Sequence, residues 1–111
     1  MVGRQLRDLG NAGRKLAVVF CTNDEMALGA VDALLADGSE LANSVAVVGV
    51  DGTPEARALI DTGRSPLRAT IVQDPYRISE IAVDLFERMV KGERVRVRTR
   101  LPVEVYEGAG G

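Results

Sequence analysis

The chain has 111 residues, with 14 basic and 16 acidic side chains that leave a formal net charge of -2. This length allows one domain at most. The near-neutral charge argues against the dense positive field on which nucleic-acid binding depends. Because the sequence contains no histidine, Ser-His-Asp and Cys-His catalysis and HExxH zinc sites are excluded within it. Its single cysteine, Cys21, cannot form an intrachain disulfide, and we interpret it as a buried, inert thiol.

The two ends of the chain show little patterning. Residues 1–15 are expected to form a short helix over 2–9 and a linker, and the glycine-rich residues 107–111 a flexible tail. The folded part is therefore predicted to span residues 16–106. No apolar run approaches the roughly 20 residues of a membrane-spanning helix, and the N-terminal residues lack the apolar segment of a secretory signal. We therefore expect a soluble chain without an export signal.

The first half of the folded part predicts a strand, a helix and a second strand. The continuous apolar run over 16–20 is typical of a strand that is buried on both faces. Thr22 is expected to be the N-cap of a helix that extends to about residue 36, because Glu25 follows three residues later and completes a capping box. A second buried strand is expected over 45–50.

The second half predicts a short helix, a strand over 69–72, a long helix that extends to about residue 90, and a final strand. Each helix begins with a polar N-cap followed by proline, which suits the first helical position: Thr53 with Pro54, and Asp74 with Pro75. A glycine that can adopt the left-handed conformation ends each helix: Gly63 and Gly92.

Four arginines alternate with other residues in the segment expected to form the final strand: Arg94, Arg96, Arg98 and Arg100. An extended backbone would place them on one face. This pattern could serve an anionic partner. We instead favour a solvated edge strand whose charges prevent aggregation, because no aromatic residues interleave and the chain is net acidic.

The alternation of strands and helices, with short connections, predicts an α/β fold. Right-handed crossovers then give a mainly parallel open sheet with helices on both faces, a Rossmann-like arrangement. In such sheets, ligands bind beyond the carboxyl ends of the strands. The residues at those positions are the first candidates for a binding site.

Polar side chains follow three successive strands of the predicted sheet. Asn23, Asp51 and Gln73 would present an amide, a carboxylate and a second amide along one edge, and Asp24 and Thr53 lie next to them. A carboxylate can accept hydrogen bonds from two neighbouring hydroxyls, and amides both donate and accept, so this set suits a polyol. Capping of helices is the alternative role for these residue types, least so for glutamine.

Three segments of the sequence resemble the C-terminal part of the ribose-binding type of periplasmic sugar-binding protein: Cys-Thr-Asn-Asp-Glu-Met-Ala-Leu-Gly-Ala from Cys21, Val-Val-Gly-Val-Asp-Gly-Thr-Pro from Val47, and Ala-Thr-Ile-Val-Gln-Asp-Pro from Ala69. The resemblance extends from about Leu16 to Tyr106. It implies a partial lobe that contacts a monosaccharide through Asn23, Asp51 and Gln73, without catalysis, cofactor or metal.

The resemblance also implies a hinge at Asp74 and Pro75, a periplasmic or cell-surface location, and an ABC permease or a chemoreceptor as the partner of the full-length protein. Most of the N-terminal lobe is missing from this chain, so only half a pocket is expected. The helix over 76–90 should consequently expose an apolar face. We expect that it either folds back onto the sheet or pairs with a second copy, by domain swapping for example.

Three other functions are weighed against this one. Ligand domains of lactose-repressor-type regulators resemble the same segments, but usually carry an Asp-Asp pair where this chain has Asp51 and Gly52. An enzyme or phosphoacceptor could use Asp24 and Asp51 with a divalent metal. The chain could also be a folded fragment without activity.

Overall fold

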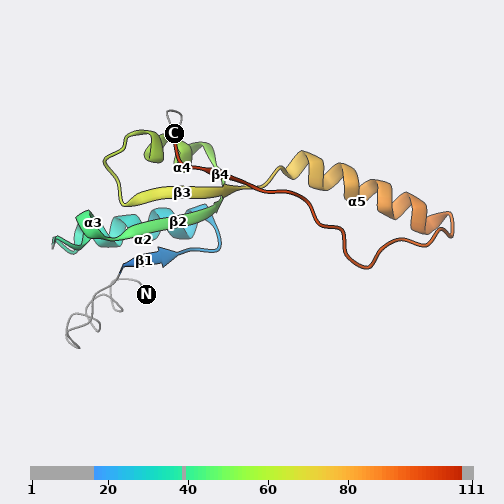
Figure 1. Cartoon of the computed structure of the whole chain (residues 1–111), viewed down its shortest axis with the longest axis horizontal. Helices are drawn as coiled ribbons and strands as arrows, with labels where there is room; N and C mark the ends of the chain where they lie inside the picture. Colours follow the sequence, from blue (N-terminus) through green and yellow to red (C-terminus); the bar gives the residue numbers. More distant parts are fainter. Residues whose placement is uncertain (1–16, 39, 109–111) are drawn as a thin grey trace.

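The computed structural model describes residues 17–38 and 40–108, and the helix predicted over 2–9 and the residues from 109 onward lie outside this part. Eight elements follow one another along the described residues (Figure 1): β1 (Val18–Phe20), α2 (Asp24–Ala36), α3 (Leu41–Ser44), β2 (Ala46–Asp51), α4 (Pro54–Asp61), β3 (Leu67–Val72), α5 (Pro75–Val90) and β4 (Glu104–Tyr106). The predicted order of strands and longer helices is confirmed. The short helix α3 was not predicted.

The four described strands form one open sheet in the order β1-β2-β3-β4. The first three strands are parallel, with Phe20 opposite Val48 and Asp51 opposite Val72. The last strand, β4, is antiparallel to β3. The mainly parallel sheet expected from the sequence is therefore confirmed, and the carboxyl ends of its three parallel strands lie at the same edge.

Helices α2 and α4 pack on the same face of this sheet. The Thr70 hydroxyl of β3 donates to Asp24 of α2, and Tyr106, which is opposite Thr70 in register, donates to Asp61 of α4. Directly opposed residues in a sheet point to the same side. One buried cluster accordingly joins both helices to the strands, with Leu34, Val47 and Ile60 among its members. Helices were expected on both faces of the sheet. In the described part of the chain, α2 and α4 cover only one of them.

The first strand, β1, differs from its prediction. It spans three residues, and Val18 and Phe20 are 56% and 60% exposed. The prediction of a strand that is buried on both faces is therefore wrong. The exposed side chains alternate with Val19, which packs against the core. This alternation fits a strand covered on one face.

The caps of the helices decide where each begins. Thr53 accepts a hydrogen bond from the Ala56 amide at 3.3 Å, and Asp74 accepts one from the Arg77 amide at 3.0 Å, so both predicted caps are confirmed. The predicted cap Thr22 of α2 is wrong. Asn23 has the extended backbone of an N-cap, and its Oδ1 accepts from the Met26 amide at 2.8 Å.

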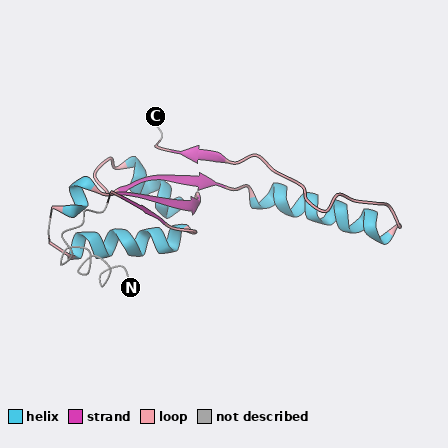
Figure 2. Ribbon diagram, turned by 60° about the horizontal axis from the view of Figure 1, so that its bottom comes forward, coloured by secondary structure: helices cyan, strands magenta, loops and turns pink. Residues whose placement is uncertain are grey.

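Helix α5 projects away from the sheet, and residues 91–103 return beside it, as Figures 1 and 2 both show. The described chain measures 59 × 33 × 17 Å with a radius of gyration of 18.5 Å, whereas a compact chain of this length would have about 13 Å. None of the α5 residues is buried. The helix therefore does not fold back onto the sheet, and this expected alternative is wrong.

The strand predicted for the four alternating arginines is also wrong. The four arginines are exposed, residues 94–100 have no regular secondary structure, and the last strand begins at Glu104. These arginines lie on the chain that returns beside α5, so no sheet edge is within reach to provide ladder hydrogen bonds. An alternating pattern forms a strand only where a partner strand is available.

Candidate functional site at the carboxyl edge of the sheet

The carboxyl edge of the parallel strands brings the three predicted site residues to neighbouring strand ends. Asn23 and Asp51 each lie three residues beyond the opposed pair Phe20 and Val48. Gln73 directly follows Val72, which is the residue opposite Asp51. Two amides and a carboxylate therefore lie at or just beyond the ends of adjacent strands, in the order that the sequence predicts.

Asp51 is the only described non-glycine residue with a positive φ, which is 128°. L-residues other than glycine rarely adopt such a backbone, and it costs on the order of 1–3 kcal/mol. Its side chain is exposed and makes no hydrogen bond or ion pair within the described residues. A strained residue that presents a free carboxylate at the ligand-binding edge of an α/β sheet is typical of a functional position.

The two amides that flank this carboxylate differ in exposure and in hydrogen bonding. Asn23 is partly exposed, and its Oδ1 is engaged by the Met26 amide, which leaves its amide nitrogen as the free donor. Gln73 is exposed, so both ends of its amide can take a ligand. Together with Asp51, the edge offers donors on either side of an acceptor.

Asp24 lies beneath this edge and is completely buried. Its Oδ1 accepts from the Thr70 hydroxyl at 2.6 Å, and its Oδ2 accepts from the Thr53 amide at 2.8 Å. A Cβ at Gly49 would overlap this carboxylate, so only glycine leaves room for it. Asp24 thus ties α2 to β3 and to the loop after β2, with both oxygens used inside the protein.

A second set of contacts, which the sequence did not indicate, holds the same loop from α4. The Arg57 Nε donates to the Gly52 carbonyl at 2.8 Å, and its guanidinium lies 5.0 Å from the centre of the Tyr106 ring. The Tyr106 hydroxyl donates to Asp61 at 2.7 Å, and this hydrogen bond, with burial, raises the pKa of Tyr106. Tyr106 is far from Arg57 in the sequence, so their contact could not be predicted. The one available signal for Arg57 was its position, one helical turn after the N-cap Thr53.

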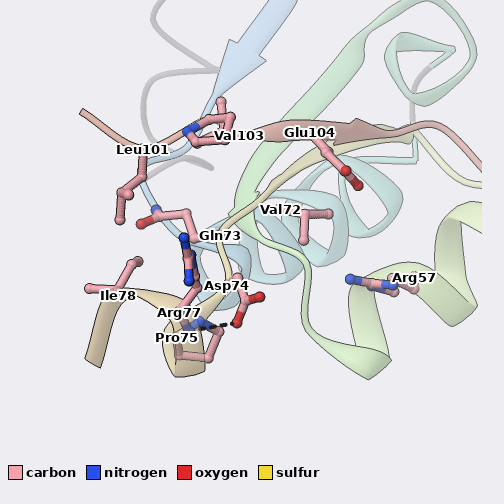
Figure 3. Close-up of a pocket in the computed structure, with 11 residues that line it drawn as sticks. Arg57, Val72, Gln73, Asp74, Pro75, Arg77, Ile78, Leu101, Val103 and Glu104 are labelled. Carbon is pink, nitrogen blue, oxygen red and sulfur yellow. Dashed lines mark hydrogen bonds between the residues drawn. The ribbon is translucent and has the colours of Figure 1, made fainter. Parts of the chain in front are cut away.

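A hollow of about 620 Å³ opens where the sheet meets α5 (Figure 3). Gln73 and the predicted hinge residues Asp74 and Pro75 line it, together with Arg57, Val72, Arg77, Ile78 and residues 101–104. Asp74 caps α5, and Pro75 is its first residue. The predicted hinge therefore coincides with the point where the chain leaves the sheet and enters the projecting helix.

The described residues contain no group of three His, Cys, Asp or Glu side chains that could hold a metal ion.

Cys21 is buried and free, and its burial raises the pKa of the thiol, as expected for an unreactive cysteine. Within residues 17–38 and 40–108, no helix has the length and apolar character needed to cross a membrane.

Comparisons with known proteins agree with this fold. The sequence profile of the periplasmic binding protein domain matches residues 3–94. The ribose import binding protein of Escherichia coli K12 is 39% identical over 93 residues, which cover 84% of this chain and 30% of that protein. The lactose operon repressor of the same strain is 29% identical over 104 residues, or 94% of this chain and 28% of the repressor.

A solved structure extends the comparison. The periplasmic solute-binding protein of Actinobacillus succinogenes 130z, with bound D-allose, superposes with a TM-score of 0.73 at 26% identity. The match covers 96% of this chain and 36% of that structure. The chain thus spans about a third of the length of the proteins that it matches.

Proposed function

Because this chain belongs to the periplasmic binding protein family, we propose that it is a non-catalytic sugar-binding part of such a protein. Its ligand is a ribose-like monosaccharide, and Asn23, Asp51 and Gln73 contact the sugar hydroxyls. In the longer protein this lobe serves an ABC importer or a chemoreceptor. The proposal rests on a single observation: the free carboxylate of Asp51 at the carboxyl edge, in a conformation that costs free energy to hold.

The chemistry of the edge supports a neutral polyol. A carboxylate accepts hydrogen bonds from two adjacent hydroxyls, and the flanking amides donate to or accept from the next ones. One similar protein is named for ribose import and another holds D-allose, and both sugars are neutral polyols. The sequence also placed Asp24 and Thr53 among the candidate contacts. We assign them a structural role at this edge, because Asp24 is buried and its two oxygens accept hydrogen bonds from the Thr53 amide and the Thr70 hydroxyl.

Calorimetric titration of the purified chain with D-ribose and D-allose tests the proposal. We expect weak, saturable binding, because a single lobe covers the ligand on one side only. Asp51→Asn keeps the shape of the side chain and removes the charge, and it should weaken binding at least tenfold, as the loss of a charged hydrogen-bonding partner does. Asp32→Asn is the matched control, since Asp32 is an exposed carboxylate on α2 away from the edge.

A second variant separates binding from folding at the same position. Glycine adopts a positive φ freely, so Asp51→Gly should raise the free energy of unfolding by about 1 kcal/mol while abolishing binding. A more stable protein that no longer binds sugar supports the assignment of Asp51. Unchanged affinity in both Asp51 variants would contradict it.

The similarity to the lactose operon repressor favours one alternative function, a ligand-sensing domain of a transcription regulator. The sequence at the edge discriminates against it, because Gly52 stands where that branch usually carries a second aspartate. A helix-turn-helix encoded upstream in the same reading frame would establish the regulator. A folded chain that binds no sugar at millimolar concentration would instead be an inactive lobe.

The exposed apolar face of α5 is assigned to pairing with a second copy of the chain. Tyr76, Val83, Phe86 and Val90 lie along one side of the helix and are 58% to 82% exposed. Tyr76 and Val90 are each seven residues from Val83, so two antiparallel helices related by a two-fold axis at Val83 would match Tyr76 of each copy with Val90 of the other. Lys91 would then approach the facing Tyr76 ring, where a cation is favoured.

Sedimentation equilibrium over a range of concentrations tests this pairing. Val83→Glu places a charge at the two-fold axis and should weaken self-association at least tenfold. Leu35→Glu is the control, because Leu35 of α2 is 57% exposed, nearly the same as the 58% of Val83. A monomeric mass at every concentration would rule out the second copy and leave α5 to be covered by the rest of a longer protein.

A further inference from the structure

The strained backbone of Asp51 requires neighbours that prevent it from relaxing. Two peptide planes meet at this residue. The plane before it is fixed by the strand, because Asp51 pairs with Val72 in the ladder between β2 and β3. The plane after it carries the Gly52 amide, which donates to the Thr70 hydroxyl oxygen at 3.1 Å. The φ and ψ of Asp51 are therefore set by contacts on both sides.

The following peptide plane, between Gly52 and Thr53, is held at both of its polar groups. Its N–H belongs to Thr53 and donates to the buried Asp24 at 2.8 Å. Its carbonyl belongs to Gly52 and accepts from Arg57 Nε at 2.8 Å. Gly52 itself has a φ of +74°, and a Cβ there would lie 2.8 Å from Val72 Cγ2. Residues 51–53 form a corner of the chain after β2. This corner cannot adopt another conformation without breaking one of these contacts.

Arg57 is in turn held in place from β4. Its guanidinium lies 5.0 Å from the centre of the Tyr106 ring, and Tyr106 donates to Asp61 at 2.7 Å, one helical turn after Arg57. Stacking on the ring and the hydrogen bond to Gly52 together restrict a side chain that is otherwise long and mobile. The last strand, which follows the chain returning from α5, is thereby connected to the corner that carries Asp51.

We propose that Arg57 is a positioning residue, which acts through the Gly52 carbonyl to hold Asp51 in its positive-φ conformation, with the carboxylate free at the ligand edge. This rests on the proposed function for its consequence, the effect on sugar binding, but the effect on the backbone of Asp51 is independent of any ligand. Tyr106 supports Arg57 through its ring.

Nuclear magnetic resonance of the unliganded chain provides the direct test. The three-bond coupling between the Asp51 amide and Hα protons depends on φ, and it is small for the conformation described here and large for an extended strand residue. In Arg57→Gln we expect this coupling to rise and the Asp51 and Gly52 amide resonances to shift. Arg64→Gln is the matched control, because Arg64 is an exposed arginine in the loop after α4.

Further variants of Arg57 and Tyr106 identify which contact of the Arg57 side chain holds the Asp51 backbone. Arg57→Lys keeps the charge but loses the planar fork that donates to Gly52 and stacks on the ring, so it should behave like Arg57→Gln. Tyr106→Phe keeps the ring and should leave the Asp51 coupling unchanged, whereas Tyr106→Leu should alter it. An unchanged Asp51 coupling in Arg57→Gln and Arg57→Lys would overturn the proposal.

Sugar titration of the same variants then measures the consequence. Arg57→Gln should lower the affinity for D-ribose or D-allose about tenfold, while Arg64→Gln leaves it unchanged. If the parent chain binds neither sugar but Arg57→Gln still changes the Asp51 coupling, the proposed function fails and the positioning of Asp51 stands. If the parent chain binds sugar and Arg57→Gln changes neither coupling nor affinity, the positioning fails and the proposed function stands.

Discussion

The sheet with its two packed helices and the projecting helix α5 are built by the same local rules but differ in what covers them. Helices α2 and α5 both begin at a polar N-cap, and both carry apolar residues at helical spacing. Five residues of α2 are buried, whereas none of α5 is. Capping and periodicity therefore make a helix, but only a covering element turns its apolar face into a core.

Truncation of an apolar side chain should show this difference most strongly. Leu34 of α2 is completely buried, and Leu34→Ala should lower the free energy of unfolding by about 3 kcal/mol through lost burial and a cavity. Phe86 of α5 is 66% exposed, and Phe86→Ala should change it by less than about 0.5 kcal/mol. Urea denaturation at a concentration where the chain is monomeric measures both. Equal losses would mean that α5 is covered in solution.

Two carboxylates give the next comparison. Asp24→Asn replaces an acceptor with an amide group that faces the Thr53 amide or the Thr70 hydroxyl, and should cost about 2–3 kcal/mol. Asp84 of α5 forms an exposed ion pair with Arg88 at 3.1 Å, and Asp84→Asn should cost about 0.3–0.5 kcal/mol. The same denaturation experiment decides. If Asp24→Asn were as mild as Asp84→Asn, Asp24 would not organise the loop.

Two glycines with positive φ sharpen the comparison further. A Cβ at Gly52 would contact Val72 Cγ2 and Arg57 Nη2, so Gly52→Ala adds a steric conflict to the backbone strain and should cost about 2–3 kcal/mol. Gly92 follows α5, has a φ of +80° and has nothing within 4 Å of such a Cβ. Gly92→Ala should therefore cost about 1 kcal/mol, from the backbone alone. Thermal unfolding followed by circular dichroism would order the two variants.

The smallest effect concerns Tyr106 and appears only at high pH. Its pKa lies above the ordinary value of 10.0, chiefly because its hydroxyl donates to Asp61. The proton is present in both states below the pKa of the unfolded chain, so the contribution to stability is complete there and is lost as the pH rises through the higher pKa of the folded chain. The difference in unfolding free energy between the parent chain and Tyr106→Phe should therefore shrink above about pH 10.

A spectroscopic measurement isolates this tyrosine. The chain has two tyrosines, so in Tyr76→Phe the ultraviolet absorbance of tyrosinate reports Tyr106 alone. Adding Asp61→Ala removes both the acceptor and its charge and should lower the apparent pKa of Tyr106. A pKa that does not change would mean that the hydrogen bond to Asp61 is not formed in solution.

The candidate site was largely predictable because its residues lie at or just beyond the ends of apolar segments that form strands. Asn23, Asp51 and Gln73 do lie at the ends of adjacent strands. Arg57 and Tyr106 could not be found this way, because their contact depends on β4 pairing with β3. The sequence placed Asp24 beside the ligand contacts, with helix capping as its alternative role, and only the fold shows that its carboxylate is buried between α2 and the loop after β2.

The sequence by itself determined the order of the strands and of the longer helices, and the residues at which α4 and α5 begin, since Thr53 with Pro54 and Asp74 with Pro75 act on amides within one helical turn. The tertiary structure alone decided which face of the sheet is covered, that α5 projects, and that the arginines after it form no strand. These outcomes depend on which distant segments are present to exclude water or provide hydrogen-bonding partners, and neighbouring residues in the sequence carry no such information.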